Sequence, residues 1–165
     1  MATIAQLPSE ARCSREQIAA FLAQKKIAAV GVSRKPADFT RKLFQELLSR
    51  GYEMIPVNPA VSEIDGLKSY ANLRDIPAPV TAALLLTSPE VTEHVVEDCL
   101  AIGVTHVWMY RASGRGAVSA HAVQECREGG INVIAGECPF MFLPRNGFVH
   151  RVHGMIRKIM GNYPR

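Results

Sequence analysis

Short apolar runs alternate along the chain with segments in which apolar residues recur every three or four positions. The runs are typical of strands buried on both faces, and the longer pattern is typical of amphipathic helices. The apolar runs predict strands over 27–32, 53–57, 81–87, 104–110 and 131–136. The helical pattern predicts helices over 14–24, 40–50, 89–101, 116–128 and, in a basic tail, 147–160. Strand and helix therefore alternate through most of the chain.

Capping and stop signals mark the ends of these helices. Ser14 and Gln17 have the spacing of a capping box at the start of the first helix. Pro89 stands at the start of the third helix, a position that favours proline. Glycines end the next helices, at Gly51, Gly103 and 129–130. Residues 58–79 predict a structured connection with a brief extended stretch and one helical turn.

This order of elements predicts an α/β fold. Continuous apolar strands belong to a parallel sheet that helices cover on both faces. With right-handed crossovers, we expect a doubly wound, mostly parallel, five-stranded Rossmann-like sheet with an extra C-terminal helix. The length suits a single domain over 1–165, with its core at about 15–143 and a basic helical tail at about 144–165. We expect the ligand at the carboxyl ends of the strands.

The composition is that of an ordinary globular domain. Hydrophobic residues make up 48% and charged residues 21% of the 165 positions. No apolar run reaches the roughly 18 residues of a membrane span. The N-terminus does not have the pattern of a secretory signal, so we expect a cytoplasmic protein without a membrane partner. The four cysteines are widely spread and form no C-x-x-C pair, which predicts buried thiols.

The net charge of +4 is unevenly distributed. Residues 1–60 hold nine Lys or Arg and five Asp or Glu, and residues 141–165 hold five Lys or Arg and no acid. Basic segments of this kind either attract an anionic ligand or form an ordinary solvated face. Nucleic acid is disfavoured as a partner, because the few aromatic residues are not interleaved with the basic ones.

The segment GVSRKP, residues 31–36, follows the first predicted strand and departs from a dinucleotide fingerprint. Of the three glycines in G-x-G-x-x-G, only Gly31 is present. The second strand ends in Val57, Asn58 and Pro59, where an NAD site has an acid that binds the ribose. The sequence therefore disfavours ordinary NAD binding.

The same segment keeps the groups that bind phosphate. Ser33 and Thr40 carry hydroxyls, and the helix start at 40–42 offers backbone N–H groups and the positive end of the helix dipole. A multiply charged anion could meet the basic side chains of Arg34, Lys35, Arg41 and Lys42. The alternative is that Ser33 and Thr40 only cap the helix and that the basic residues face solvent.

The order of motifs resembles a known family. G-V-S-R-K-P before a helix, I-P-V-N-P, a strand that ends in T-S-P, and E-C-P after the fifth strand are similar to the CoA-binding domain family. This family is the small, free-standing relative of the CoA-binding domain in the succinyl-CoA synthetase α subunit. The similarity covers about residues 15–143, and the tail goes beyond it. It implies a Rossmann-like fold that holds coenzyme A (CoA) across the strand ends.

The resemblance also implies a set of contact residues. The pyrophosphate and 3′-phosphate of CoA would lie against the loop of Gly31, Val32, Ser33, Arg34 and Lys35. Phe39 and Thr40 would meet the phosphates at the helix start. After the second strand, a wall beside the ligand would be formed by Val57, Asn58 and Pro59. After the third strand, the adenine of CoA would lie against Thr87, Ser88 and Pro89. A basic loop suits CoA independently of the family, because CoA carries a diphosphate and a 3′-phosphate.

No familiar catalytic motif accompanies this site. The chain lacks G-x-S-x-G, G-x-x-x-x-G-K-[ST] and H-E-x-x-H. Cys138, His150 and His153 could instead hold a metal, or Cys138 could form a mixed disulfide with CoA. The simpler interpretation is a buried cysteine and two surface histidines. We therefore expect no metal and no catalysis by the chain itself.

The expected function is binding of CoA or an acyl-CoA by a carrier, a sensor or the partner of an acyl-CoA enzyme. The alternatives are an NADP-dependent oxidoreductase and a nucleotide-sensing interaction module that uses the basic C-terminal helix. The sequence leaves the acyl group and the oligomeric state open, a homodimer included. We expect Trp108 to lie in the core. We favour a covering of the core over a dimer contact for Phe140, Met141, Phe142, Leu143 and Phe148.

Overall fold

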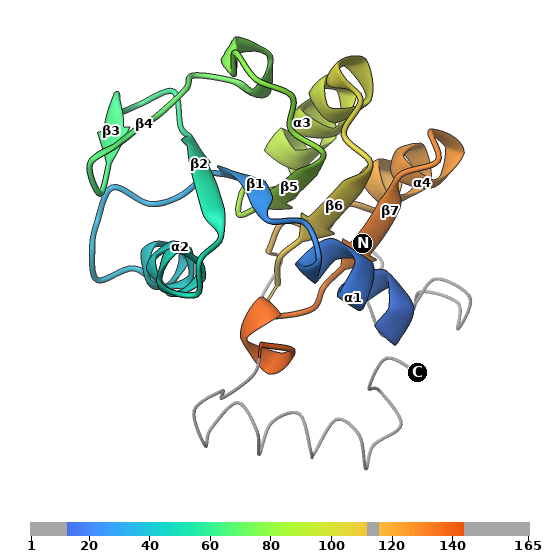
Figure 1. The fold of residues 1–165 in the computed structure, drawn as a ribbon. Coiled ribbons are helices and arrows are strands. Elements are labelled where there is room, and N and C mark those ends of the chain that lie inside the picture. The colour runs from blue at the N-terminus through green and yellow to red at the C-terminus, as the bar shows by residue number, and fades with distance from the viewer. Residues whose placement is uncertain (1–12, 112–115, 144–165) are drawn as a thin grey trace.

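The computed structural model describes residues 13–111 and 116–143, which form a five-stranded sheet with helices on both of its faces (Figure 1). The strands are β1 (Lys26–Val30), β2 (Glu53–Val57), β5 (Ala82–Leu85), β6 (His106–Met109) and β7 (Asn132–Ala135). All are parallel, in the order β2-β1-β5-β6-β7. The doubly wound, Rossmann-like α/β fold predicted from the sequence is therefore confirmed.

The described helices are α1 (Arg15–Leu22), α2 (Phe39–Ser49), α3 (Pro89–Ile102) and α4 (Ala120–Glu128). The predicted capping box is present: the Ser14 hydroxyl accepts the N–H of Gln17 at 3.1 Å, and the Gln17 side chain accepts the N–H of Ser14 at 2.7 Å. The helix predicted from residue 116 begins later, at Ala120. Ser119 precedes it as the N-cap, because its hydroxyl accepts the N–H of Ala122 at 3.3 Å.

The two faces of the sheet carry separate apolar cores. Along β1, Ile27 and Ala29 pack with α1 and α2, whereas Ala28 and Val30 pack with α3 and α4. Successive side chains of a strand point to opposite faces, so a strand covered on both sides must be apolar throughout. Trp108 is fully buried, as predicted, and its ring N–H donates to the Glu137 carbonyl at 2.8 Å.

The connection between β2 and β5 has the two features that the sequence predicted. β3 (Glu63–Ile64) and β4 (Leu67–Lys68) form a short antiparallel hairpin, and η3 (Leu73–Asp75) is a single turn of 3₁₀-helix. Tyr70 forms an isolated parallel bridge with Val57, which holds this connection against the end of β2. The hairpin lies beyond the edge strand β2 in Figure 1.

After β7, a second 3₁₀ turn, η4 (Pro139–Met141), closes one end of the core. Met141 and Leu143 are buried, and Phe140 and Phe142 pack against the core, as we expected of this segment. Phe148 and the predicted helix over 147–160 lie outside the described residues. None of the helices that the structure describes is long and apolar enough to cross a membrane.

Candidate functional site

The carboxyl ends of β1, β2 and β5 meet at the switch point of the sheet. The chain leaves β1 for β2 on one side, and β5 occupies the other side of β1. In open α/β sheets this reversal leaves a crevice in which ligands bind. The N–H of Gly31 donates to the Val57 carbonyl at 2.9 Å, and the N–H of Leu86 donates to the Val30 carbonyl at 2.8 Å. Gly31 therefore stands between the ends of the neighbouring strands.

Only glycine suits position 31. Its φ of 89° is in the left-handed region. A Cβ built there would lie 2.9 Å from Cγ2 of Thr87 and 3.0 Å from the carbonyl carbon and oxygen of Leu86. The end of β5 thus approaches the loop after β1 more closely than a side chain would allow. The predicted residues Gly31 and Thr87, far apart in sequence, are brought together here.

Ser33 organises the loop between β1 and α2. Its N–H donates to the Thr40 hydroxyl at 3.1 Å, and its carbonyl accepts Nη1 of Arg41 at 3.1 Å. Its hydroxyl accepts the N–H of Lys35 at 3.1 Å and donates to the carboxylate of Asp38. Every polar group of Ser33 therefore has a partner within the loop or the first turn of α2. The hydroxyls of Ser33 and Thr40 do not cap the helix, as the alternative interpretation had it, but join the loop to the start of α2.

Arg41 is paired with a carboxylate of the protein itself and is not free to meet the anion of a ligand, contrary to our expectation for this residue. Its guanidinium forms a bidentate ion pair with Asp65, with Nε to Oδ2 at 2.7 Å and Nη2 to Oδ1 at 2.6 Å. Arg41 is only 8% exposed. The hydrogen bond from Arg41 lowers the pKa of Asp65 below its ordinary value, against the opposing effect of burial. This pair fastens the β3–β4 hairpin to α2.

The other basic residues at the loop remain at the surface. The side chains of Arg34, Lys35 and Lys42 are exposed. The backbone N–H of Lys42 donates to the Asp38 carbonyl at 3.1 Å, so this predicted phosphate donor is already used by the helix. Asp38, the N-cap residue of α2, was missed by the sequence reasoning, although an acid before a helix is a recognisable N-cap signal.

Asn58 fastens the end of β2 to the end of β1. Its side-chain Nδ2 donates to the Val32 carbonyl at 2.9 Å, and its Oδ1 accepts the N–H of Ala60 at 2.9 Å. Its own N–H donates to the Tyr70 carbonyl at 2.9 Å. The amide at this position supplies a donor that an ionised carboxylate could not. Val57 is buried and Pro59 is exposed beside it.

The segment after β5 uses its polar groups to begin α3. The hydroxyl of Thr87 shares a hydrogen bond with the hydroxyl of Thr92 at 2.8 Å. Ser88 is the N-cap of α3, and its hydroxyl accepts the N–H of Val91 at 3.5 Å. Pro89 is the first residue of the helix. These residues lie at the carboxyl edge as predicted, but the structure gives their hydroxyls internal partners.

An aromatic cluster borders the same edge. The ring of Phe39 stacks on that of Tyr110 with centroids 5.1 Å apart and an interplanar angle of 14°. Phe140 meets Phe39 edge-on at 5.5 Å and 75°. Burial raises the pKa of Tyr110, and the nearby Cys138 adds to this effect. Sequence reasoning assigned Phe39 to the site but not Tyr110, because nothing local connects the end of β6 with the start of α2.

The alternative of a metal or thiol centre at Cys138 depends partly on residues outside the described ranges, and the expectation of no metal stays a prediction. Cys138 is buried at 7% exposure, close to the carboxyl end of β7. His150 and His153 lie outside the described residues. Within residues 13–111 and 116–143, no three His, Cys, Asp or Glu side chains are grouped so as to hold a metal.

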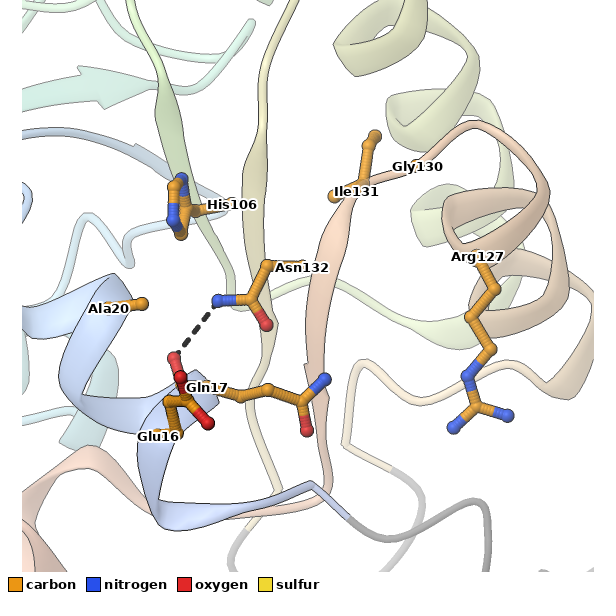
Figure 2. Close-up of a pocket in the computed structure, with 8 residues that line it drawn as sticks. All are labelled: Glu16, Gln17, Ala20, His106, Arg127, Gly130, Ile131 and Asn132. Carbon is orange, nitrogen blue, oxygen red and sulfur yellow. Dashed lines mark hydrogen bonds between the residues drawn. The ribbon is translucent and has the colours of Figure 1, made fainter.

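A pocket of about 520 Å³ opens at the opposite end of the sheet, where the strands begin (Figure 2). His106 and Asn132, the first residues of β6 and β7, line it together with residues of α1 and of the end of α4. Asn132 Nδ2 donates to the Gln17 carbonyl at 3.0 Å, which holds α1 against β7. The pocket contains none of the predicted contact residues. We place the candidate site at the carboxyl edge, because the loop and strand ends described above converge there.

Comparison with known proteins points to one family. A family model described as CoA binding domain matches residues 25–144. The uncharacterized protein YneT of Bacillus subtilis strain 168 is 31% identical over 114 residues, which are 69% of this chain and 82% of that protein. The alpha subunit of acetate–CoA ligase [ADP-forming] II from Pyrococcus furiosus is 27% identical over 109 residues. These cover 66% of this chain but only 24% of that subunit.

Solved structures agree with this assignment. A hypothetical protein from Pyrococcus horikoshii OT3 matches with a TM-score of 0.70 and 29% identity, over 84% of this chain and 92% of that one. A conserved hypothetical protein from Pyrococcus furiosus matches with a TM-score of 0.62 and 32% identity, over 69% of this chain and 95% of that one. The match extends over almost the full length of both small proteins.

Proposed function

The chain belongs to the CoA-binding domain family, and we propose that it binds coenzyme A or an acyl-CoA at the carboxyl edge of β1, β2 and β5. The observation that carries the proposal is the loop after β1, which lies at the switch point of the sheet and is cross-linked through the hydrogen bonds of Ser33. A preorganised loop loses little freedom when a ligand binds.

The charges at this loop suit CoA. Arg34 and Lys35 are exposed next to Ser33 and can reach a phosphate without breaking an ion pair with a described residue. Arg41 is unavailable because Asp65 holds it, so the 3′-phosphate and the diphosphate depend on the exposed pair and on the start of α2. The amide of Asn58, tied to Val32, leaves no acid for the ribose of NAD.

The proposed role is that of a binding protein rather than an enzyme. CoA or acyl-CoA would be carried, sensed or passed to an acyl-CoA enzyme. The ligase subunit of Pyrococcus furiosus, of which this chain matches about a quarter, supports the last of these roles. None of the four cysteines, all in the described residues, forms a disulfide, which suits the reducing cytoplasm.

Thermal unfolding of the full chain with CoA, dephospho-CoA, NAD and NADP tests the proposal. A ligand at about a hundred times its dissociation constant adds roughly 2.7 kcal/mol of stability, or a rise of several degrees in Tm. We expect this rise with CoA, a smaller one with dephospho-CoA and none with NAD. A rise with NADP and none with CoA would replace the proposal with the oxidoreductase alternative.

A double variant and a control at the other end of the sheet test the role of the basic pair. Changing Arg34→Gln and Lys35→Gln together should bring the affinity for CoA close to that for dephospho-CoA, because the contact with the 3′-phosphate is lost. Lys26→Gln is the control, since Lys26 begins β1 at the opposite edge of the sheet and pairs with Glu53 at 3.5 Å. An equal loss in the control would show only a general effect of positive charge.

A further inference from the structure

Arg41 connects the proposed phosphate loop with the β3–β4 hairpin. Its Nη1 donates to the Ser33 carbonyl at 3.1 Å, and its Nε and Nη2 donate to the two carboxylate oxygens of Asp65 at 2.7 and 2.6 Å. The hairpin lies beside the loop that joins β1 to α2 in Figure 1. Because a guanidinium is a rigid planar fork, the two bonds to Asp65 also fix the direction in which Nη1 points. Asp65 therefore sets the position of the group that holds Ser33.

The carboxylate of Asp65 is not needed for the hairpin turn itself. Asp65 and Gly66 are the two residues between β3 and β4, and both have a positive φ, 51° and 77°. Asparagine tolerates this region as aspartate does, and Asn–Gly and Asp–Gly both favour such a turn. What asparagine cannot do is accept both arms of a guanidinium with two ionised oxygens. The acid at the tip of the hairpin is therefore suited to the contact with Arg41.

The bond from Arg41 orients the peptide unit between Ser33 and Arg34. This unit is trans, so the Ser33 carbonyl and the Arg34 N–H point in opposite directions. The carbonyl is turned towards Arg41, which is buried, and the N–H is therefore turned away from it. No described residue accepts the Arg34 N–H, and the Arg34 side chain is exposed. The peptide thus presents a backbone donor beside the basic side chains that the proposed function assigns to the phosphates.

Resting on the proposed function, we infer that Asp65 is a positioning residue of the CoA site. It holds Arg41, and Arg41 holds the peptide between Ser33 and Arg34 so that the Arg34 N–H can donate to a phosphate. Asp65 does this from a hairpin that follows β2, without a contact of its own with the ligand. An acid close to the site then strengthens the binding of an anion, although its charge repels one.

Asp65→Asn separates positioning from charge, because the two predict opposite signs. Removing an acid next to an anion site strengthens binding by charge alone, the more so if Arg41 turns to the phosphates. If Asp65 positions the loop, Asp65→Asn should instead bind CoA about 2- to 30-fold more weakly. Isothermal titration of the full chain with CoA measures the change. Asparagine suits the left-handed turn, so the variant should fold.

Arg41→Lys tests the same contact at constant charge. Lysine keeps the positive charge but has no fork that meets Asp65 and Ser33 together. We expect Arg41→Lys to lose CoA affinity in the same range as Asp65→Asn. Asp65→Asn added to Arg41→Lys should cause no further loss, because the connection from Asp65 to the loop is already broken. A further loss in the double variant would mean that Asp65 acts without Arg41.

Two variants control for charge and for the stability of α2. Glu63→Gln removes an exposed acid from the same hairpin, and its affinity for CoA should not fall. Glu46→Gln breaks the ion pair of Glu46 with Arg50, 2.6 Å long, towards the far end of α2. It should change the affinity by less than about twofold.

Nuclear magnetic resonance of the same proteins gives a readout at the donor itself. CoA should shift the amide signal of Arg34 in the wild type and in Glu46→Gln. The shift should be smaller in Asp65→Asn at saturating CoA, because the peptide is no longer held towards the ligand.

The outcomes distinguish the inference from the proposed function. A wild type that does not bind CoA overturns both. If the wild type binds CoA and Asp65→Asn binds it equally well or more tightly, the inference alone is wrong. It is also wrong if Arg41→Lys binds as the wild type does, or if Glu46→Gln loses as much affinity as Asp65→Asn. Should Asp65→Asn not fold, the affinity of Arg41→Lys decides.

Discussion

The hydroxyl of Ser33 donates a hydrogen bond to the carboxylate of Asp38 at the start of α2. Asp38 occupies the N-cap position, yet its side chain makes no capping bond to the helix. Its negative charge is therefore directed to the loop, where the positive end of the helix dipole and Ser33 both favour an anion. An internal carboxylate thus accepts from the Ser33 hydroxyl, a donor close to the basic side chains that the proposed function assigns to the phosphates.

Asp38→Asn should strengthen CoA binding. The change removes a negative charge that repels the phosphates, and the amide oxygen of Asn is a weaker acceptor for the Ser33 hydroxyl than the carboxylate is. We expect a gain of about fivefold to tenfold in affinity at low ionic strength, which shrinks as salt is added. Isothermal titration at two salt concentrations measures it.

The control for this prediction is Glu53→Gln. Glu53 is an exposed acid and the first residue of β2, so it lies at the end of the sheet opposite the proposed site. Its replacement by Gln changes the net charge by the same amount as Asp38→Asn. An equal gain in both variants would mean that net charge, and not the contact with Ser33, sets the affinity. Weaker binding by Asp38→Asn would show that the carboxylate helps to build the site.

Gly31→Ala should destabilise the protein more than Gly51→Ala. Both glycines have a left-handed φ, 89° and 84°, which costs alanine about 1–2 kcal/mol. Nothing lies within 4 Å of a Cβ at Gly51, whereas at Gly31 the Cβ meets Leu86 and Thr87 at 3.0 Å or less. We expect Gly31→Ala to lose at least about 1 kcal/mol more, by urea unfolding. Equal losses would mean that β5 moves away at little cost.

The pair of Arg41 and Asp65 should make stability depend on acid pH. Its hydrogen bond lowers the pKa of Asp65 in the folded state below the unfolded value. The contribution to stability is therefore complete above about pH 4 and is lost as the pH falls through the folded pKa. Asp65→Asn should lower the free energy of unfolding by about 2 kcal/mol at pH 7. It should also reduce the loss of stability at acid pH.

Urea unfolding between pH 2 and pH 7 measures this effect. Glu63→Gln is the matched control, because Glu63 is an exposed acid on the same hairpin. It should leave the stability within about 0.5 kcal/mol at every pH. If stability falls equally at acid pH in Asp65→Asn and in the wild type, other carboxylates cause the pH dependence.

Cys99 and Cys126 should resist alkylation in the folded protein. Both are fully buried, and burial raises the pKa of Cys126 to about 12 and that of Cys99 well above its usual range. The thiolate is the reactive form, so iodoacetamide at pH 8 should modify these two residues only after denaturant is added. Peptide mass spectrometry follows each site. Modification of the native chain at the rate of an exposed thiol would contradict the burial.

The local pattern of residues was enough to predict the elements that surround the site. β2 has the predicted bounds, and the capping box of Ser14 and Gln17 and the proline at the start of α3 are as expected. These features depend on neighbours within one or two turns of chain. Strands buried on both faces can be recognised because their apolar runs are continuous. The position of Gly31 at a strand end followed from the same information.

The tertiary structure alone decided which polar groups at the site are available. Arg41 looks like its basic neighbours in sequence, and only the hairpin brings Asp65 to it. Tyr110 reaches Phe39 because β6 and α2 end at the same edge of the sheet. Contacts of this kind join residues that are far apart in the chain at no regular spacing, so no local sequence pattern predicts them. The sequence by itself therefore determined the fold and the loop, whereas the packing of distant segments decided which groups of the loop can meet a ligand.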